Sequence, residues 1–78
     1  MSIKEQILEV LKEVKPTKDL GRLTDIVEGG YIDSFELMLL ISTLSEQFNI
    51  EIGVDDIIPE NFNSIDCIEK MIQRLTNN

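Results

Sequence analysis

The sequence predicts an all-α protein, a small bundle of three main helices plus one short helix, with a long loop between the first and second helices. Three segments repeat apolar residues three and four positions apart, which is the spacing of one helix face. A residue that favours helix starts lies at the beginning of each segment. The 78 residues suffice for a single domain over positions 1–78, but not for a deep catalytic cavity.

The first helix is predicted to run from Ile3 to about Val14. Ser2 and Glu5 have the spacing of a capping box, in which each side chain bonds to the other residue's backbone N–H. The apolar residues of one face are Ile3, Ile7, Val10, Leu11 and Val14. Pro16 ends the helix because it has no N–H and its ring collides with the preceding turn.

A long connection is predicted from Lys15 to Asp33. Four apolar residues are expected to anchor it onto the core: Leu20, Leu23, Ile26 and Ile32. Gly29 and Gly30 indicate a tight turn with backbone angles that other residues rarely adopt. So long a loop is uncommon in a small domain unless it packs against the core or serves the function.

The second helix is predicted to run from Ser34 to about Phe48. Its core-facing residues are Leu37, Leu40, Ile41, Leu44 and Phe48. A second group projects on a different side of this helix: Phe35, Met38 and Leu39, with Ser42 and Glu46. The helix therefore carries an apolar patch turned away from its own core, and Ser34 lies near the border between the two faces.

The remaining residues are predicted to form a loop, one short helix and the last main helix. Ile50 and Ile52 are expected to be buried in the loop. Val54 to Ile58 is expected to form one short helical turn that Pro59 stops. Ser64 is predicted to be the N-cap of the last helix. The apolar stripe of that helix is Ile65, Ile68, Ile72 and Leu75.

The net charge of −8 is unevenly distributed along the chain. Five of the seven basic residues lie in the first 22 positions: Lys4, Lys12, Lys15, Lys18 and Arg22. Residues 23–69 contain eleven acidic residues and no Lys or Arg. Such a charge distribution repels nucleic acid and anionic membranes and attracts basic protein surfaces. We therefore exclude nucleic-acid binding.

The sequence predicts a cytoplasmic protein without a membrane span. The longest unbroken apolar run, from Leu37 to Ile41, is far shorter than the roughly 20 residues that a spanning helix needs. The first 14 residues mix charged with apolar residues, unlike a signal peptide. The lone Cys67 cannot form an internal disulfide, which fits a reducing compartment.

No catalytic or metal site is predicted. The chain has no His and one Cys, so it lacks the usual base for nucleophilic catalysis. Asp55, Asp56 and Glu60 lack the alternating ligands and the glycine of a calcium-binding loop, and are interpreted as a solvated acidic face. Cys67 lies off the apolar stripe of its helix and is interpreted as a packing residue.

A serine opens the most apolar helix directly after an aspartate that can cap that helix alone. Asp33 is a strong N-cap residue, and Glu36 can complete a capping box. Ser34 would then be the first residue inside the helix, with a hydroxyl that has no assigned backbone partner. That hydroxyl would point outward at the positive end of the helix dipole, where N–H groups favour a phosphate. The alternative is that Ser34 is itself the cap of an ordinary helix.

The segment GYIDSFELMLLISTLSEQF resembles the signature of the acyl and peptidyl carrier protein family, in which an Asp-Ser-Leu-like triplet opens the second helix. The resemblance covers nearly the whole chain. It includes the amphipathic first helix, the long loop, Gly30 shortly before the serine, Phe48 near the end of the second helix, and the IEI that follows that helix. It continues through the short acidic helix at Val54 to Ile58 and through NSIDCIEKMI as the last helix.

The resemblance implies that Ser34 carries 4′-phosphopantetheine, attached covalently from coenzyme A by a holo-carrier-protein synthase. Asp33 would help that synthase to bind metal and substrate. The arm would hold acyl or aminoacyl groups as thioesters. An acyl or aminoacyl ligase, or an adenylating enzyme, would load the arm, and downstream acyl-processing enzymes would use the cargo. The chain would then be a monomeric carrier and not an enzyme.

The resemblance also implies a surface on the second helix that docks partner enzymes. The docking residues would be Phe35, Glu36, Met38, Leu39 and Glu46. The apolar members coincide with the patch found by helical projection, and the two glutamates would pair with basic residues on partners. Docking of this kind is expected to be weak and transient, so that each enzyme releases the carrier to the next.

Two departures from the family pattern bear on the pathway. Phe35 replaces the commoner leucine, as in some stand-alone D-alanyl carriers and in carriers of specialised pathways. Leu39 and Ser45 fill positions that are often acidic in carriers of primary fatty-acid synthesis. A dedicated carrier with its own ligase or adenylating enzyme is therefore at least as well supported as a carrier for fatty-acid synthesis.

A different class of function explains some of the same features. A small acidic helical adaptor would bind a basic protein through Phe35, Met38 and Leu39, with Ser34 unmodified. Such an adaptor would tolerate the substitution Ser34→Ala, whereas a carrier would lose its function.

Overall fold

The structure is a computed structural model that describes residues 2–76, and within those residues it contains helices and no strand. The elements in chain order are α1 (Ile3–Val14), η1 (Leu20–Arg22), α2 (Ser34–Phe48), η2 (Val54–Asp56), α3 (Pro59–Phe62) and α4 (Ile65–Thr76), where η marks a 3₁₀ helix. The predicted all-α class, with three main helices and a long loop after the first, is confirmed. No helix within the described range is long and apolar enough to cross a membrane.

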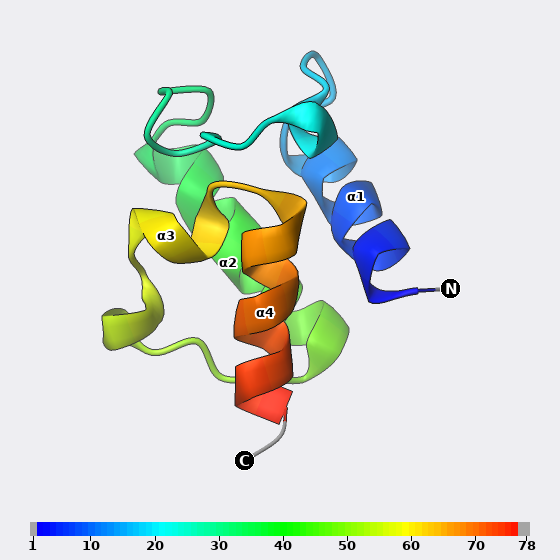
Figure 1. Ribbon diagram of the computed structural model, residues 1–78, viewed down its shortest axis with the longest axis vertical. Coiled ribbons are helices and arrows are strands. Elements are labelled where there is room, and N and C mark those ends of the chain that lie inside the picture. Colours follow the sequence, from blue (N-terminus) through cyan, green and yellow to red (C-terminus); the bar gives the residue numbers. More distant parts are fainter. Residues whose placement is uncertain (1, 77–78) are drawn as a thin grey trace.

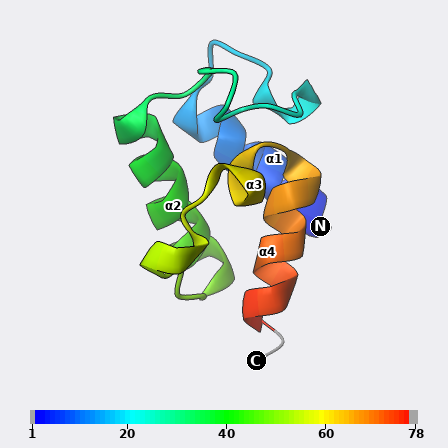
Figure 2. The same ribbon diagram turned by 60° about the vertical axis from the view of Figure 1, so that its left-hand side comes forward.

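The three main helices surround one core, and α3 packs beside α4 (Figure 1). Helix α1 runs opposite to α2 and α4, so the C-terminus of α1 and the N-termini of α2 and α4 all point toward the long loop (Figures 1 and 2). The loop crosses this end of the bundle before it enters α2. Ser34, the first residue of α2, therefore lies where the loop joins the bundle.

The start of α1 has the predicted capping box. The backbone N–H of Glu5 donates to Ser2 Oγ at 3.1 Å, and the backbone N–H of Ser2 donates to Glu5 Oε1 at 3.1 Å. The hydrogen bond that the backbone N–H of Ser2 donates to the Glu5 carboxylate, together with a contribution of the Ser2 side chain, lowers the pKa of Glu5 because it stabilises the charged form. The predicted bounds of this helix are confirmed.

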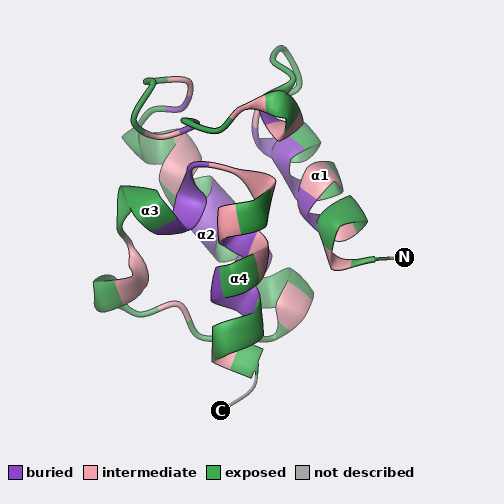
Figure 3. Ribbon diagram, in the orientation of Figure 1, coloured by how far each residue is buried: buried purple, intermediate pink, exposed green. Residues whose placement is uncertain are grey.

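The core is made of apolar side chains from all the main helices, the loop and α3, and Figure 3 shows them on the inward sides of these elements. The buried apolar residues are Ile7, Val10, Leu11, Val14, Leu20, Ile26, Ile32, Leu40, Ile41, Leu44, Phe62, Ile68, Met71 and Ile72. Of the predicted loop anchors, Leu23 is only partly buried and the other three are buried. Ile50 and Ile52, expected to be buried, are partly buried.

The predicted boundaries of the short helix at Val54 to Ile58 are wrong. The turn η2 covers only Val54–Asp56, and Pro59 begins α3 where it was expected to stop a helix. Proline suits the first position of a helix because its missing N–H would have no partner there. Helix α3 buries Phe62, which is 1% exposed, and burial of such a ring is worth about 1.5–3 kcal/mol.

Helix α4 begins as predicted. The backbone N–H of Cys67 donates to Ser64 Oγ at 3.1 Å, so the Ser64 hydroxyl caps the helix.

An ion pair joins α1 to α4, in which Lys4 Nζ lies 3.0 Å from Asp66 Oδ1. Their hydrogen bond raises the pKa of Lys4 and lowers the pKa of Asp66. Both side chains are more than half exposed, so this ion pair adds little to stability.

Candidate functional site

The start of α2 has a capping box made by Asp33 and Glu36. The backbone N–H of Glu36 donates to Asp33 Oδ1 at 2.8 Å, and the backbone N–H of Asp33 donates to Glu36 Oε1 at 2.9 Å. Asp33 has the extended backbone of an N-cap residue, and its carbonyl accepts the first intrahelical bond, from the N–H of Leu37 at 2.9 Å. The prediction that Asp33 caps this helix is confirmed.

Ser34 is the first residue of α2 and is exposed. Because Asp33 fills the cap, the helix start does not need the Ser34 hydroxyl, and within residues 2–76 no hydrogen bond involves Ser34 Oγ. The hydroxyl lies at the positive end of the α2 dipole, where backbone N–H groups without helical partners favour an anion. An exposed hydroxyl in this position fits attachment through a phosphate ester.

The loop before Ser34 is fixed by a buried side chain from the corner between α3 and α4. Asn63, 7% exposed, accepts at Oδ1 from the N–H groups of Val27 (3.0 Å) and Glu28 (3.1 Å). Its Nδ2 donates to Glu28 Oε1 at 2.5 Å, and its carbonyl accepts from the N–H of Ile26 at 2.9 Å. Of the two glycines predicted to adopt unusual backbone angles in a tight turn, Gly30 has a positive φ of 74° and Gly29 does not. Asn63 was not predicted, because a local pattern does not show its distant partners.

Lys15 connects the end of α1 to the start of α2. Its Nζ lies 3.4 Å from Glu36 Oε1, the same oxygen that accepts the N–H of Asp33. The side chains of Lys15 and Glu36 are 29% and 22% exposed. Glu36, predicted to pair with basic residues of partners, is thus already paired within the chain, and its docking role stays a prediction. The contact with Lys15 was not predicted.

The outer face of α2 carries the predicted apolar patch. Three apolar residues are exposed: Phe35 (75%), Met38 (57%) and Leu39 (41%). Ser42 and Glu46, predicted to accompany them, are also exposed. Two further apolar residues are exposed outside α2, Val54 in η2 and Ile58 before α3. The patch is confirmed as a surface feature, and its use in docking stays a prediction.

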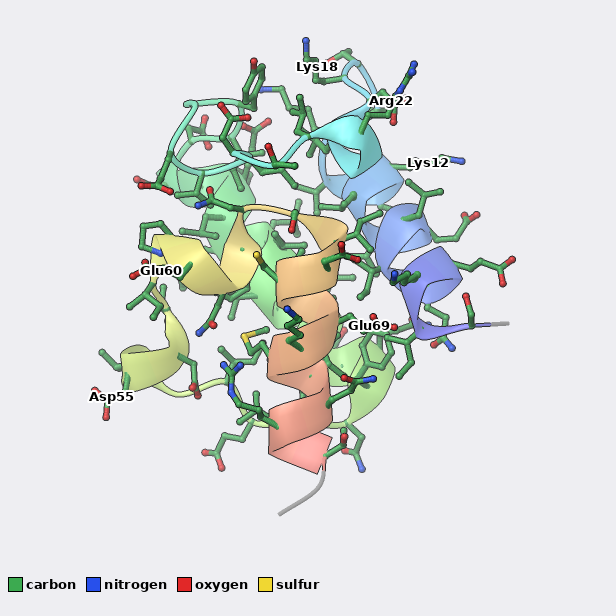
Figure 4. All side chains as sticks on the ribbon, in the orientation of Figure 1. Lys12, Lys18, Arg22, Asp55, Glu60 and Glu69 are labelled. Atoms are coloured by element: carbon green, nitrogen blue, oxygen red, sulfur yellow. The ribbon has the colours of Figure 1, made fainter. Side chains whose placement is uncertain are left out.

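Three basic side chains and two acidic side chains lie at opposite sides of the molecule, although acidic residues also occur along α1. Figure 4 shows Lys12, Lys18 and Arg22 around the C-terminal part of α1 and η1, with Asp55 and Glu60 on the other side, at η2 and α3. Within the described chain, no group of three or more His, Cys, Asp or Glu side chains could hold a metal ion. Cys67 is half-buried and free.

An open hollow with a volume of about 560 Å³ lies between α1 and the segment that follows it. Its lining residues are Leu8, Lys12, Pro16, Thr17, Lys18 and Asp19. None of the residues that the sequence predicts as functional lines this hollow. The predicted site at the start of α2 therefore lies outside this hollow.

One comparison with known proteins gives a match. A family model described as a phosphopantetheine attachment site matches residues 2–75. No curated protein matches the chain.

Proposed function

The chain belongs to the family with a phosphopantetheine attachment site, and from that membership we propose that Ser34 is the attachment residue of an acyl carrier protein. Proteins of this family hold 4′-phosphopantetheine covalently, so this group is the cofactor. The observation that carries the assignment to Ser34 is the capping box. Asp33 and Glu36 form the helix start by themselves, which leaves an exposed hydroxyl at the positive end of a helix.

When it is bound, 4′-phosphopantetheine supplies a flexible arm with a terminal thiol that holds acyl or aminoacyl groups as thioesters. The chain's own residues present the root of this arm. The cap keeps Ser34 at a fixed point on α2, and the hydrogen bonds of Asn63 hold the loop that precedes it. Asp33 is proposed to help the modifying synthase bind metal and substrate.

Separate enzymes carry out the chemistry in this proposal, and the chain acts as their substrate carrier. The partners are a holo-carrier-protein synthase, a ligase or adenylating enzyme that loads the arm, and enzymes that process the cargo. Their proposed docking surface is the outer face of α2: Phe35, Glu36, Met38, Leu39 and Glu46. The surface combines exposed apolar side chains with carboxylates, which supports weak, rapid association with basic surfaces.

The exposed patch also supports a second candidate function, an acidic helical adaptor without modification. Phe35, Met38 and Leu39 are exposed together on one helix, and such a grouped apolar patch supports a contact surface for a protein in either case. The two functions differ in what they require of Ser34.

The intact mass of the protein distinguishes them after incubation with coenzyme A, Mg²⁺ and a broad-specificity phosphopantetheinyl transferase. We expect the wild type to gain one phosphopantetheinyl group and Ser34→Ala to gain none. Ser42→Ala, which removes another exposed serine of α2, is the matched control and should gain the group like the wild type. No gain in a folded wild-type sample would leave Ser34 as an ordinary helix residue and favour the adaptor.

A further inference from the structure

The side chain of Lys15 reaches the attachment end of α2 from another helix. Lys15 is the C-cap of α1, and its backbone N–H donates to the carbonyl of Leu11 at 3.0 Å, so its main chain is fixed. Its ammonium lies 3.4 Å from Glu36 Oε1. That oxygen also accepts the N–H of Asp33 at 2.9 Å, and Asp33 directly precedes Ser34. The Lys15 ammonium is therefore linked through Glu36 to the residue that precedes the attachment hydroxyl.

The surroundings of Ser34 are otherwise acidic. Asp33 precedes it directly, Glu36 lies two residues after it, and residues 23–69 contain no Lys or Arg. A phosphodiester on Ser34 would bring a further negative charge close to these two carboxylates, and the like charges would repel each other. Any basic residue that offsets this repulsion must come from outside the segment 23–69.

The other ion pairs and cation contacts of the described residues engage different parts of the molecule. Lys4 pairs with Asp66 and Glu69, and Arg22 pairs with Asp19. Lys18 lies 5.0 Å from the centre of the Tyr31 ring. Among the cation contacts found between residues 2 and 76, the one with Lys15 is the one that reaches the capping box of α2.

The chemistry of the ammonium group allows it to bind two anions. It has three N–H donors, and in this structure Glu36 accepts from one of them. Both side chains are largely shielded from solvent, so their charges are screened less than those of surface pairs. We propose that, on the carrier modified at Ser34, Lys15 Nζ donates to a phosphate oxygen of the arm while it remains bound to Glu36. This inference rests on the proposed modification of Ser34.

This contact would hold the root of the arm against the junction of α1 and α2. The thiol end of the arm would stay free to move, while the first bonds after Ser34 would take a restricted range of directions. Lys15 is thus a positioning residue for the arm.

The test compares apo and phosphopantetheinylated forms of the wild type, Lys15→Gln and Lys12→Gln. Lys12 is an exposed lysine of the same helix, so its variant has the same change of charge. In the ³¹P NMR spectrum, we expect Lys15→Gln to shift the phosphodiester resonance and Lys12→Gln to leave it in place. In the modified wild type, the ε-methylene protons of Lys15 should show a nuclear Overhauser effect to the first methylene of the arm.

Thermal unfolding separates this role from a merely structural one. If Lys15 only links α1 to α2 through Glu36, Lys15→Gln lowers the melting temperature equally in the apo and modified forms. We expect the loss to be larger in the modified form, by about 2 °C or more for a domain of this size. Lys15→Arg, which keeps the charge and binds phosphate well, should restore the behaviour of the wild type.

Intact mass shows for every sample whether Ser34 carries the group. A mass gain combined with an unchanged ³¹P resonance in Lys15→Gln, and with equal losses of melting temperature, would overturn the role of Lys15 and leave the carrier function standing. Failure of the wild type to gain mass would overturn the proposed function and this inference together.

Discussion

Helices α2 and α4 each have a serine at the N-terminal end, and the two hydroxyl groups are used differently. Ser64 lies before α4 and caps it, because its Oγ accepts the N–H of Cys67 at 3.1 Å. Ser34 lies inside α2, one residue after the cap, and its hydroxyl is exposed. A serine at a helix start is thus structural or available for chemistry according to which neighbouring residue provides the cap.

The two serines also differ in burial and in the neighbouring side chain. Ser64 is half-buried and follows Asn63, which is buried and bonded to the loop across the molecule. Ser34 is followed by Phe35, which projects into solvent. The N-terminal end of α4 is therefore tied into the fold, whereas that of α2 exposes a large apolar side chain to solvent.

The largest effect on stability is expected at the α4 end. Asn63→Ala removes the oxygen that accepts the backbone N–H groups of Val27 and Glu28. It also removes the amide group that donates to the Glu28 side chain. We expect the free energy of unfolding to fall by about 2 kcal/mol in urea titrations. We also expect slower modification of Ser34, because the loop that precedes it is released. A free energy within about 0.5 kcal/mol of the wild type would show that these bonds are not what holds the loop.

A smaller effect is expected at the cap of α2. Asp33→Ala removes the acceptor for the N–H of Glu36 and should lower the free energy of unfolding by about 1 kcal/mol. Asp33→Asn is the matched control, because asparagine caps helices about as well as aspartate. If both variants were as stable as the wild type, Asp33 would not be the working cap and the contrast between the two serines would lose its basis.

The smallest effect is expected at α1, the other main helix that begins with a capping box. The pKa of Glu5 is lowered in the folded protein, mainly by the hydrogen bond from the backbone of Ser2. A carboxylate with a lowered pKa stabilises the fold above its ordinary value of 4.5 and loses this contribution as the pH falls through the folded pKa. The stability of the wild type relative to Glu5→Gln should therefore decrease as the pH is lowered from neutral to below 4.5, which urea titrations at several pH values would measure. A difference between the two proteins that does not change with pH would contradict this assignment.

The features that the sequence predicted correctly depend on short-range patterns. The bounds of α1 and α2, their capping boxes, the cap of α4 and the exposed patch on α2 all follow from residues within one or two helical turns. Helix periodicity and capping chemistry are local, so they can be recognised without the fold. The resemblance to carrier proteins was also visible, because its signature is a continuous segment around Ser34.

The features that were missed depend on contacts between distant residues or on a choice between two local outcomes. Asn63 bonds to residues about 35 positions away, and Lys15 reaches Glu36 across 21 positions. No local pattern specifies either pairing. Pro59 could stop one helix or begin another, and the burial of Phe62 by α3 selects the second outcome.

The mass measurement on variants of both serines, combined with the stability of each variant, tests most directly whether Asp33 frees the Ser34 hydroxyl. We expect Ser34→Ala to gain no phosphopantetheinyl group and to unfold within about 0.5 kcal/mol of the wild type. We expect Ser64→Ala to gain the group and to lose about 1 kcal/mol of stability. A Ser34→Ala variant that still gains the group, or that loses as much stability as Ser64→Ala, would contradict the claim that Asp33 frees the Ser34 hydroxyl for modification.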